Sequence, residues 1–292
     1  MAVPLVIPVG MVSGSQVTDS QDKAIKAGGH KLKISLNAYS FNDPLSKGTM
    51  NLDDLLEFCA QHNFDAVDLT GYYFPGYPAV PSDEYIYHIK RKAFRLGLDI
   101  SGTGVRNDFT DPDESKRKKD VALVKNWIDC ASKMGAPVIR IFSGKQIPVG
   151  YSWEQTLEWM MKDINECVDY GKKHGVIVAI QNHDDFIQTA EQVKKIIDGA
   201  DSEWFGLVLD IGSYRTHDPY KEIENTATYA VNWQIKEKIF LDGREVKPDL
   251  ARIMKIIKSS PYRGYLPIET LGSEDPRVKV PLFLEQVRKA LA

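Results

Sequence analysis

Four short apolar runs in the second half of the chain end in polar side chains whose types suit a chemical site. These side chains are Gln181 and His183, Asp210, Gln234 and Lys236, and Glu269. Carboxylates can move protons or hold cations, an imidazole can act as an acid or a base, and an ammonium can stabilise an oxyanion. All of these groups are costly to desolvate unless they bind a partner. The run ends therefore predict one binding site, provided that the fold brings them together.

The elements that must position these side chains repeat along the chain from Lys33 onwards. Eight apolar runs read as strands, over residues 33–41, 65–70, 98–105, 137–144, 176–183, 205–212, 231–240 and 264–270. A helical pattern follows each run. After the fourth run, for example, the apolar stripe of one helix face consists of Trp153, Leu157, Met160, Ile164 and Cys167. Eight parallel crossovers in about 250 residues close most naturally into a single α/β domain, a (β/α)8 TIM barrel over residues 33–292.

An open, doubly wound sheet is the alternative fold. A glycine fingerprint for a dinucleotide would be expected after its first strand, where this chain instead reads Asn37-Ala-Tyr-Ser-Phe-Asn. The barrel is therefore favoured, and no organic cofactor is evident.

The amino-acid composition limits which kinds of partner the chain could bind. The chain has 292 residues, 43% of them hydrophobic, and a net charge of -3, so it has no general attraction for nucleic acid. No run reaches the ~20 apolar residues of a membrane span. Residues 1–32 form an irregular extension with an apolar start, which fits either the remnant of an export signal or an arm packed on the body. Cytoplasmic and exported, periplasmic locations both stay open.

In a barrel the carboxyl ends of all the strands open at one mouth, so the other strands add to the site. They contribute Asn37, Arg106 and Arg140, and the aromatic loop after the second strand contributes Tyr72. Side chains alternate along a strand, so Gln181 and His183 should share one face while Asn182 points away from it. Trp233 should pack outward under the helices. The loop rings either stack on the apolar face of a sugar or cover the barrel.

From Lys33 to the C-terminus the chain resembles the xylose isomerase-like barrels, which include sugar isomerases, ketose 3-epimerases and the endonuclease IV group. Members typically hold a divalent metal with a Glu ending the fifth strand, an Asp ending the sixth, a His in a His-x-Lys stretch on the seventh, and a Glu ending the eighth. Those positions are occupied here by Gln181, Asp210, Gln234 and Glu269, and Lys236 completes the stretch. Two of the four positions depart from the family pattern.

The resemblance implies oxygen ligands for a hard ion such as Mg²⁺ or Mn²⁺, supplied by Asp210, Glu269, Gln181 and Gln234. His183 could supplement them and shift the preference towards Mn²⁺ or, less readily, Zn²⁺. The two glutamines fit hydrogen bonding to a substrate equally well. The alternative is an ion-paired pocket without a metal, in which Asp210 pairs with Lys236 or Arg140.

Family members move a proton between two glutamates on opposite faces of an enediolate, and the carboxamide of Gln181 has no useful basicity. Epimerisation by the usual pair is therefore not expected. The resemblance instead implies a sugar isomerase/epimerase-like enzyme that moves a proton next to a carbonyl of a carbohydrate or polyol. Glu269 would be the base, His183 a second acid or base, and Lys236 would stabilise negative charge.

Two alternatives stay open. One is a lyase or hydrolase of a keto-glycoside, for which one base and one acid suffice. The other is a sugar-binding barrel whose chemistry has been lost with the two replaced ligands. The predicted partner is a small-molecule carbohydrate and not nucleic acid, and a homo-oligomer is left open.

Overall fold

The computed structural model describes residues 32–183 and 186–292. The chain divides into two units, residues 1–31 and 32–292, and the second unit is described below. The predicted extension and its interpretation as an export-signal remnant fall, apart from Leu32, outside the described residues. Among the helices that the structure describes, none is long and apolar enough to cross a membrane.

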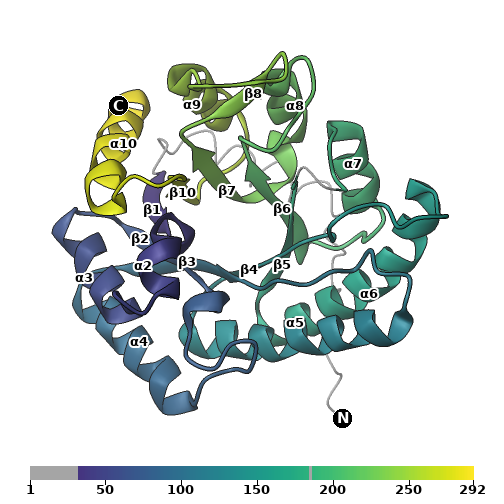
Figure 1. The fold of residues 1–292 in the computed structure, drawn as a ribbon, viewed down its shortest axis with the longest axis horizontal. Helices are drawn as coiled ribbons and strands as arrows, with labels where there is room; N and C mark the ends of the chain where they lie inside the picture. Colours follow the sequence, from purple (N-terminus) through teal and green to yellow (C-terminus); the bar gives the residue numbers. More distant parts are fainter. Residues whose placement is uncertain (1–31, 184–185) are drawn as a thin grey trace, which may run out of the picture. The chain divides into compact units, whose positions relative to one another are not determined.

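Eight parallel strands close into a barrel (Figure 1). In chain order they are β1 (Lys33–Asn37), β2 (Ala66–Thr70), β3 (Asp99–Gly104), β4 (Val138–Ile141), β5 (Ile177–Gln181), β6 (Phe205–Asp210), β7 (Ala230–Lys236) and β10 (Tyr265–Glu269). Around the barrel the order is β1-β10-β7-β6-β5-β4-β3-β2. All eight predicted strands are present, and the predicted α/β barrel is confirmed.

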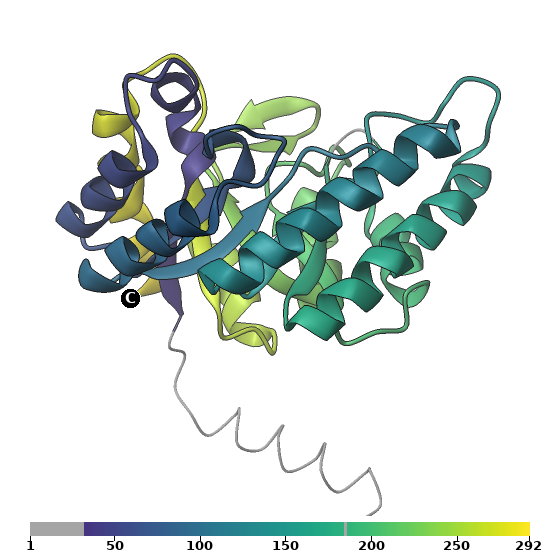
Figure 2. The same cartoon turned by 90° about the horizontal axis from the view of Figure 1, so that it is seen from below.

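Helices surround the strands, with α2 (Asn42–Ser46), α3 (Leu52–Gln61), α4 (Asp83–Arg95), α5 (Glu114–Met134), α6 (Trp153–His174), α7 (Ala190–Asp198), α8 (Pro219–Thr226), α9 (Leu250–Ser259) and α10 (Pro276–Leu291). Short 3-10 turns add η1 (Ala38–Phe41), η2 (Gly71–Tyr73) and η3 (Ala227–Tyr229). Figure 2 shows the two longest of these helices, α5 and α6, side by side. A buried ion pair joins them, because Arg117 Nε lies 2.7 Å from Asp163 Oδ2.

Seven of the eight strands end earlier than the apolar runs predict, and at β1 and β6 the polar side chain at the strand end binds the backbone that follows. Asn37 ends β1 and its Oδ1 accepts a hydrogen bond from Tyr39 N at 2.8 Å, which caps η1. Asp210 ends β6 and its Oδ1 accepts from Gly212 N at 2.9 Å. The predicted strand over 231–240 is divided: β7 stops at Lys236, and β8 (Ile239–Leu241) pairs with β9 (Arg244–Val246) in a separate antiparallel hairpin.

Packing of the strand faces agrees with most of the predicted alternation. Trp233 is fully buried beside Tyr262, the residue between α9 and β10, as predicted for a side chain under the helices. The barrel interior has a polar layer, in which the hydroxyls of Ser35 and Ser101 are 2.6 Å apart and Asp68 lies 3.4 Å from Asn232 Nδ2. The functional end of the barrel rests on this layer.

Candidate functional site

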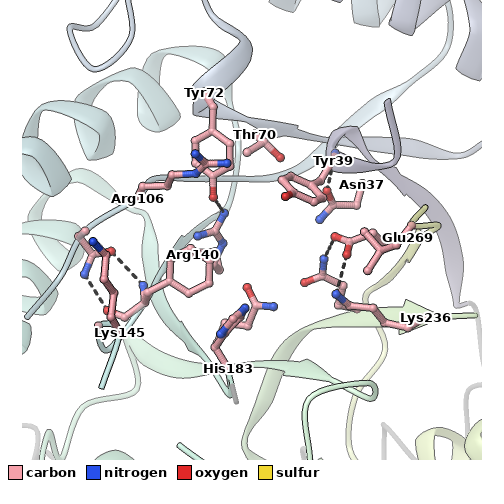
Figure 3. Close-up of a pocket in the computed structure, with 16 residues that line it drawn as sticks. Asn37, Tyr39, Thr70, Tyr72, Arg106, Arg140, Lys145, His183, Lys236 and Glu269 are labelled. Atoms are coloured by element: carbon pink, nitrogen blue, oxygen red, sulfur yellow. Dashed lines mark hydrogen bonds and ion pairs between the residues drawn. The ribbon is translucent and has the colours of Figure 1, made fainter. Parts of the chain in front are cut away.

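A cavity of about 440 Å³ opens at the carboxyl ends of the strands (Figure 3). Nine predicted side chains line it: Asn37, Tyr72, Arg106, Arg140, Gln181, His183, Gln234, Lys236 and Glu269. The tenth, Asp210, lies directly behind them and is fully buried. The volume is within the range of small-molecule sites, roughly 300 to 1,000 Å³. The fold therefore brings the predicted site residues together, while their individual roles stay predictions.

Lys236 lies at the centre of the charged part of the site. Its Nζ is 2.5 Å from Glu269 Oε1 and 3.1 Å from Asp210 Oδ2. These contacts follow from the sheet, because β7 lies between β6 and β10 and pairs Lys236 with Glu269 and Gln234 with Asp210. Gln234 and Lys236 share a face of β7, as alternation predicts.

The two glutamines also turn N–H groups towards the carboxylates. Gln181 Nε2 donates to Asp210 Oδ2 at 2.7 Å, and Gln234 Nε2 donates to Glu269 Oε2. With Lys236 and the backbone N–H of Gly212, every carboxylate oxygen of Asp210 and Glu269 accepts at least one hydrogen bond. Buried carboxylates require hydrogen-bond donors of this kind.

Charge and burial shift the pKa values in this cluster. Burial alone would lower the pKa of Lys236, but the charges of Asp210 and Glu269 outweigh it and hold that pKa above its ordinary value. Burial, together with the nearby charge of Asp210, raises the pKa of Glu269, and Lys236 opposes the rise. Lys236 is therefore a permanent cation at neutral pH, and Glu269 is a stronger base than an exposed glutamate.

A wall of arginines and aromatic rings forms another side of the cavity. Arg140 donates to the Tyr72 hydroxyl and, at 2.7 Å, to the carbonyl oxygen of Val105, while its guanidinium lies 4.0 Å from the centre of the Phe142 ring. The Arg106 guanidinium lies 4.3 Å from the centre of the Tyr72 ring. These cation–π contacts orient both arginines and hold the ring of Tyr72 at the cavity wall.

The rings of the aromatic loop after β2 lie in different surroundings. Tyr72 lines the cavity. Phe74 and Tyr77 instead pack on Trp127 of α5, with ring centres 5.4 and 5.6 Å apart. The Tyr73 hydroxyl donates to Asn42 at 2.9 Å. Of the four rings in this loop, only Tyr72 is therefore placed to touch a ligand in the cavity. The other three hold the loop on the barrel.

His183 and Asn182 lie just beyond Gln181, the last residue of β5. His183 still lines the cavity, with its ring edge-on to Phe142 at 5.2 Å between centres. Asn182 is fully buried and makes two hydrogen bonds to the backbone of Asp210. It points away from the cavity, as predicted, but its amide binds the neighbouring strand end.

Asp68 and Asn232, beneath the cavity, are absent from the predicted set. Burial raises the pKa of Asp68 to about 6, with Arg140 lowering it and Glu269 raising it. An Asp inside the otherwise apolar run Ala66–Thr70 was the signal that could have identified it. Tyr39, Phe142 and Lys145 also line the cavity. They follow strand ends, Tyr39 in η1 and the other two in the segment after β4, where residue type alone carries little information.

The donor chemistry around Asp210 and Glu269 does not fit a divalent metal. A hard ion such as Mg²⁺ or Mn²⁺ needs lone pairs on the groups around it. Here the N–H groups of Gln181, Gln234 and Lys236 face the two carboxylates and offer none. Within residues 32–183 and 186–292, no three His, Cys, Asp or Glu side chains are grouped so that they could hold a metal ion. Metal ligation by the four predicted residues stays a prediction, and the contacts agree with the ion-paired alternative.

Comparison with known proteins places the chain in a family. The model of the xylose isomerase-like TIM barrel family matches residues 56–287, so the chain belongs to that family. No curated protein matches the sequence significantly.

Several solved structures are similar in fold. D-psicose 3-epimerase from Clostridium cellulolyticum H10, with D-tagatose, has a TM-score of 0.73 at 16% identity, covering 89% of this chain and 99% of that one. The 3-keto-D-glucoside 4-epimerase from E. coli has a TM-score of 0.72 at 14% identity, covering 89% and 100%. An L-ribulose 3-epimerase has a TM-score of 0.70 at 16% identity, covering 89% and 94%. At these identities the similarity shows the fold.

Proposed function

We propose that the protein is an isomerase-type enzyme that moves a proton next to a carbonyl of a carbohydrate or polyol. The observation that carries the proposal is the Glu269 carboxylate, which lines the cavity, is almost fully buried and contacts the Lys236 ammonium. Structures of similar fold include sugar 3-epimerases and a keto-glucoside 4-epimerase, which supports a sugar as the substrate class.

Glu269 acts as the base. Its raised pKa brings the carboxylate closer to the basicity that proton abstraction at neutral pH requires. It takes the proton from the carbon beside the carbonyl, the C–H electron pair forms the C=C bond of an enediolate, and the carbonyl oxygen receives the negative charge. Each oxygen of Glu269 accepts one hydrogen bond and keeps a second lone pair for this step.

Lys236 stabilises the enediolate. An ammonium has three N–H donors, and the contacts with Asp210 and Glu269 use two of them. The third is available to the substrate oxygen, because Lys236 also lines the cavity. When Glu269 becomes neutral by taking the proton, the charge of Lys236 is less compensated and attracts the new oxyanion more strongly. The negative charge thus passes from the base to the substrate beside a fixed cation.

His183 is the second acid or base. Gln181, at the strand end where the family has a glutamate, donates an N–H to Asp210 and cannot accept a proton. The imidazole of His183 lines the same cavity, and an imidazole can both donate and accept a proton. It returns a proton to the enediolate or moves one between the substrate oxygens.

The remaining predicted residues bind substrate hydroxyls and ring faces. Tyr72 offers an aromatic face to the apolar side of a sugar, and Arg106 and Arg140 flank it. Asn37, Gln181 and Gln234 supply amide groups at the cavity floor. The ring of Tyr72 favours a neutral carbohydrate.

The test is the substitution Glu269→Gln. NMR measures whether the protein exchanges carbon-bound hydrogen of ketoses and aldoses for deuterium from D₂O. We expect turnover to be abolished while calorimetric sugar binding is retained. The matched control is Glu245→Gln on the exposed hairpin, where Glu245 pairs with Lys238. Exchange that continues in the Glu269→Gln protein would remove Glu269 from the mechanism.

Two other functions use the same side chains. One base and one acid, Glu269 and His183, suffice for a lyase or hydrolase of a keto-glycoside, and product analysis on such a substrate separates elimination from isomerisation. The glutamines at two family ligand positions favour the second candidate, a sugar-binding barrel. Tight calorimetric sugar binding without turnover under any divalent ion supports that case.

A further inference from the structure

We infer that Lys236 is the resident cation of this site and that its ammonium excludes a divalent metal from the position between Asp210 and Glu269. The inference deepens the proposed function, since it names the source of positive charge there. Its test measures metal uptake and not turnover, so it can fail or stand independently of the proposed reaction.

The site contains two buried carboxylates, and their negative charge requires a cation. The side chains of Asp210 and Glu269 are 0% and 3% exposed, and that of Lys236 is 16% exposed. Buried carboxylates that share a site are strongly destabilising without a cation between them. Lys236 Nζ contacts an oxygen of each, at 3.1 and 2.5 Å, and is therefore where a bridging metal would have to lie.

The order of the strands in the barrel also places Lys236 between the two carboxylates. Strand β7 lies between β6, which ends in Asp210, and β10, which ends in Glu269. Lys236 is the last residue of β7 and pairs directly with Glu269. Asp210 pairs with Gln234, two residues earlier on the same face. The barrel thus places the ammonium between the two carboxylates through backbone pairing.

The remaining hydrogen bonds of the two carboxylates also oppose a metal ion. Gly212 N and Gln234 Nε2 donate to the two oxygens that Lys236 does not contact, and Gln181 Nε2 shares Asp210 Oδ2 with Lys236. A divalent ion at this position would have to displace the ammonium from two ion pairs and rotate both carboxamides to present their oxygens. An N–H group offers no lone pair to a cation, so each of these changes opposes metal binding.

Mn²⁺ uptake tests the inference. The full chain is treated with EDTA, dialysed and titrated with MnCl₂ alone, with bound metal measured by electron paramagnetic resonance and calorimetry. We expect no stoichiometric uptake by the unchanged protein. The variant Lys236→Met leaves the two carboxylates without a cation and should gain one Mn²⁺ per chain, together with a rise in its thermal midpoint when Mn²⁺ is added.

Three further variants make the result specific. Lys236→Arg keeps the cation and should exclude Mn²⁺ as the unchanged protein does. The double variant Lys236→Met with Asp210→Asn should lose the gained uptake. Lys238→Met, at an exposed lysine two residues along, should leave uptake at zero.

Stoichiometric Mn²⁺ uptake by the unchanged protein would overturn the inference, and this measurement stands even if Lys236→Met does not fold. Uptake by Lys236→Arg equal to that of a folded Lys236→Met would also overturn it, because the charge would then not be what excludes the metal. A folded Lys236→Met that binds no Mn²⁺ would likewise show that the ammonium does not occupy a metal position.

Discussion

Asn182 and Asp210 are joined by two hydrogen bonds between a side-chain amide and a backbone. Asn182 Nδ2 donates to the carbonyl oxygen of Asp210 at 2.9 Å, and Asp210 N donates to Asn182 Oδ1 at 2.8 Å. The amide thereby continues the pairing of β5 with β6 beyond Gln181, the last residue of β5. It also holds in place the backbone that carries the Asp210 carboxylate.

The substitution Asn182→Ala is expected to destabilise the protein by roughly 1–3 kcal/mol, because it leaves the buried N–H of Asp210 without its partner and the C=O with only the 3.4 Å bond from Ser213 N. Urea unfolding at pH 7 measures the loss. Asn225→Ala, at an exposed position of α8, is the control and should change stability by no more than about 0.5 kcal/mol. Equal stability of the two variants would mean that another group satisfies the Asp210 backbone.

The buried carboxyl of Asp68 should make stability depend on pH. Its pKa is raised from 3.8 to about 6 in the folded protein, mainly by burial, so the folded state binds a proton more tightly than the unfolded state. The associated stabilisation is fully present below about pH 3.8 and is lost as the pH rises through about 6. For a shift of this size the loss is about 3 kcal/mol.

Asp68→Asn removes this titration, so the stability of the variant relative to the unchanged protein should rise between pH 4 and pH 7. Urea unfolding over this range is the measurement. Asp43→Asn, on the exposed surface of α2, is the control at a carboxyl that is not buried, and the change for Asp68→Asn should exceed the change for this variant. A difference for Asp68→Asn that does not change with pH would contradict the assignment of the raised pKa to this residue.

Tyr72 should contribute to substrate binding through its ring more than through its hydroxyl. Tyr72→Phe keeps the face that stacks with Arg106 and loses only the oxygen that accepts from Arg140. Tyr72→Ala loses the ring as well. Aromatic stacking worth ~0.5–1.5 kcal/mol predicts that KM rises about 2- to 10-fold further in the alanine variant.

Steady-state kinetics on the substrate identified by the exchange assay measure these changes. Tyr73→Phe is the matched control, since the Tyr73 hydroxyl binds Asn42 outside the cavity and its loss should leave KM unchanged. A KM for Tyr72→Ala equal to that for Tyr72→Phe would show that the ring does not contact the substrate.

Much of the fold and the membership of the site were predictable from residue order. Helical stripes and short apolar runs are local properties, and eight of them in alternation leave few arrangements other than a closed barrel. Parallel strands of a barrel end at one mouth, so polar residues at their ends must meet. For this reason Gln181, Gln234, Lys236 and Glu269 all line the cavity.

Only the tertiary structure decides which atoms of these residues face one another. Residue order left Asp210 free to bind a metal, Arg140 or Lys236, and the pairing of β7 between β6 and β10 brings Lys236 Nζ within 3.1 Å of its carboxylate. The orientation of Gln181 and Gln234 as donors depends on carboxylates from other strands. Alternation predicts that Asn182 points away from the cavity, but the binding of its amide to the backbone of Asp210 depends on the neighbouring strand. Contacts between distant segments, and the burial that they create, are properties of the assembled barrel and of no single run.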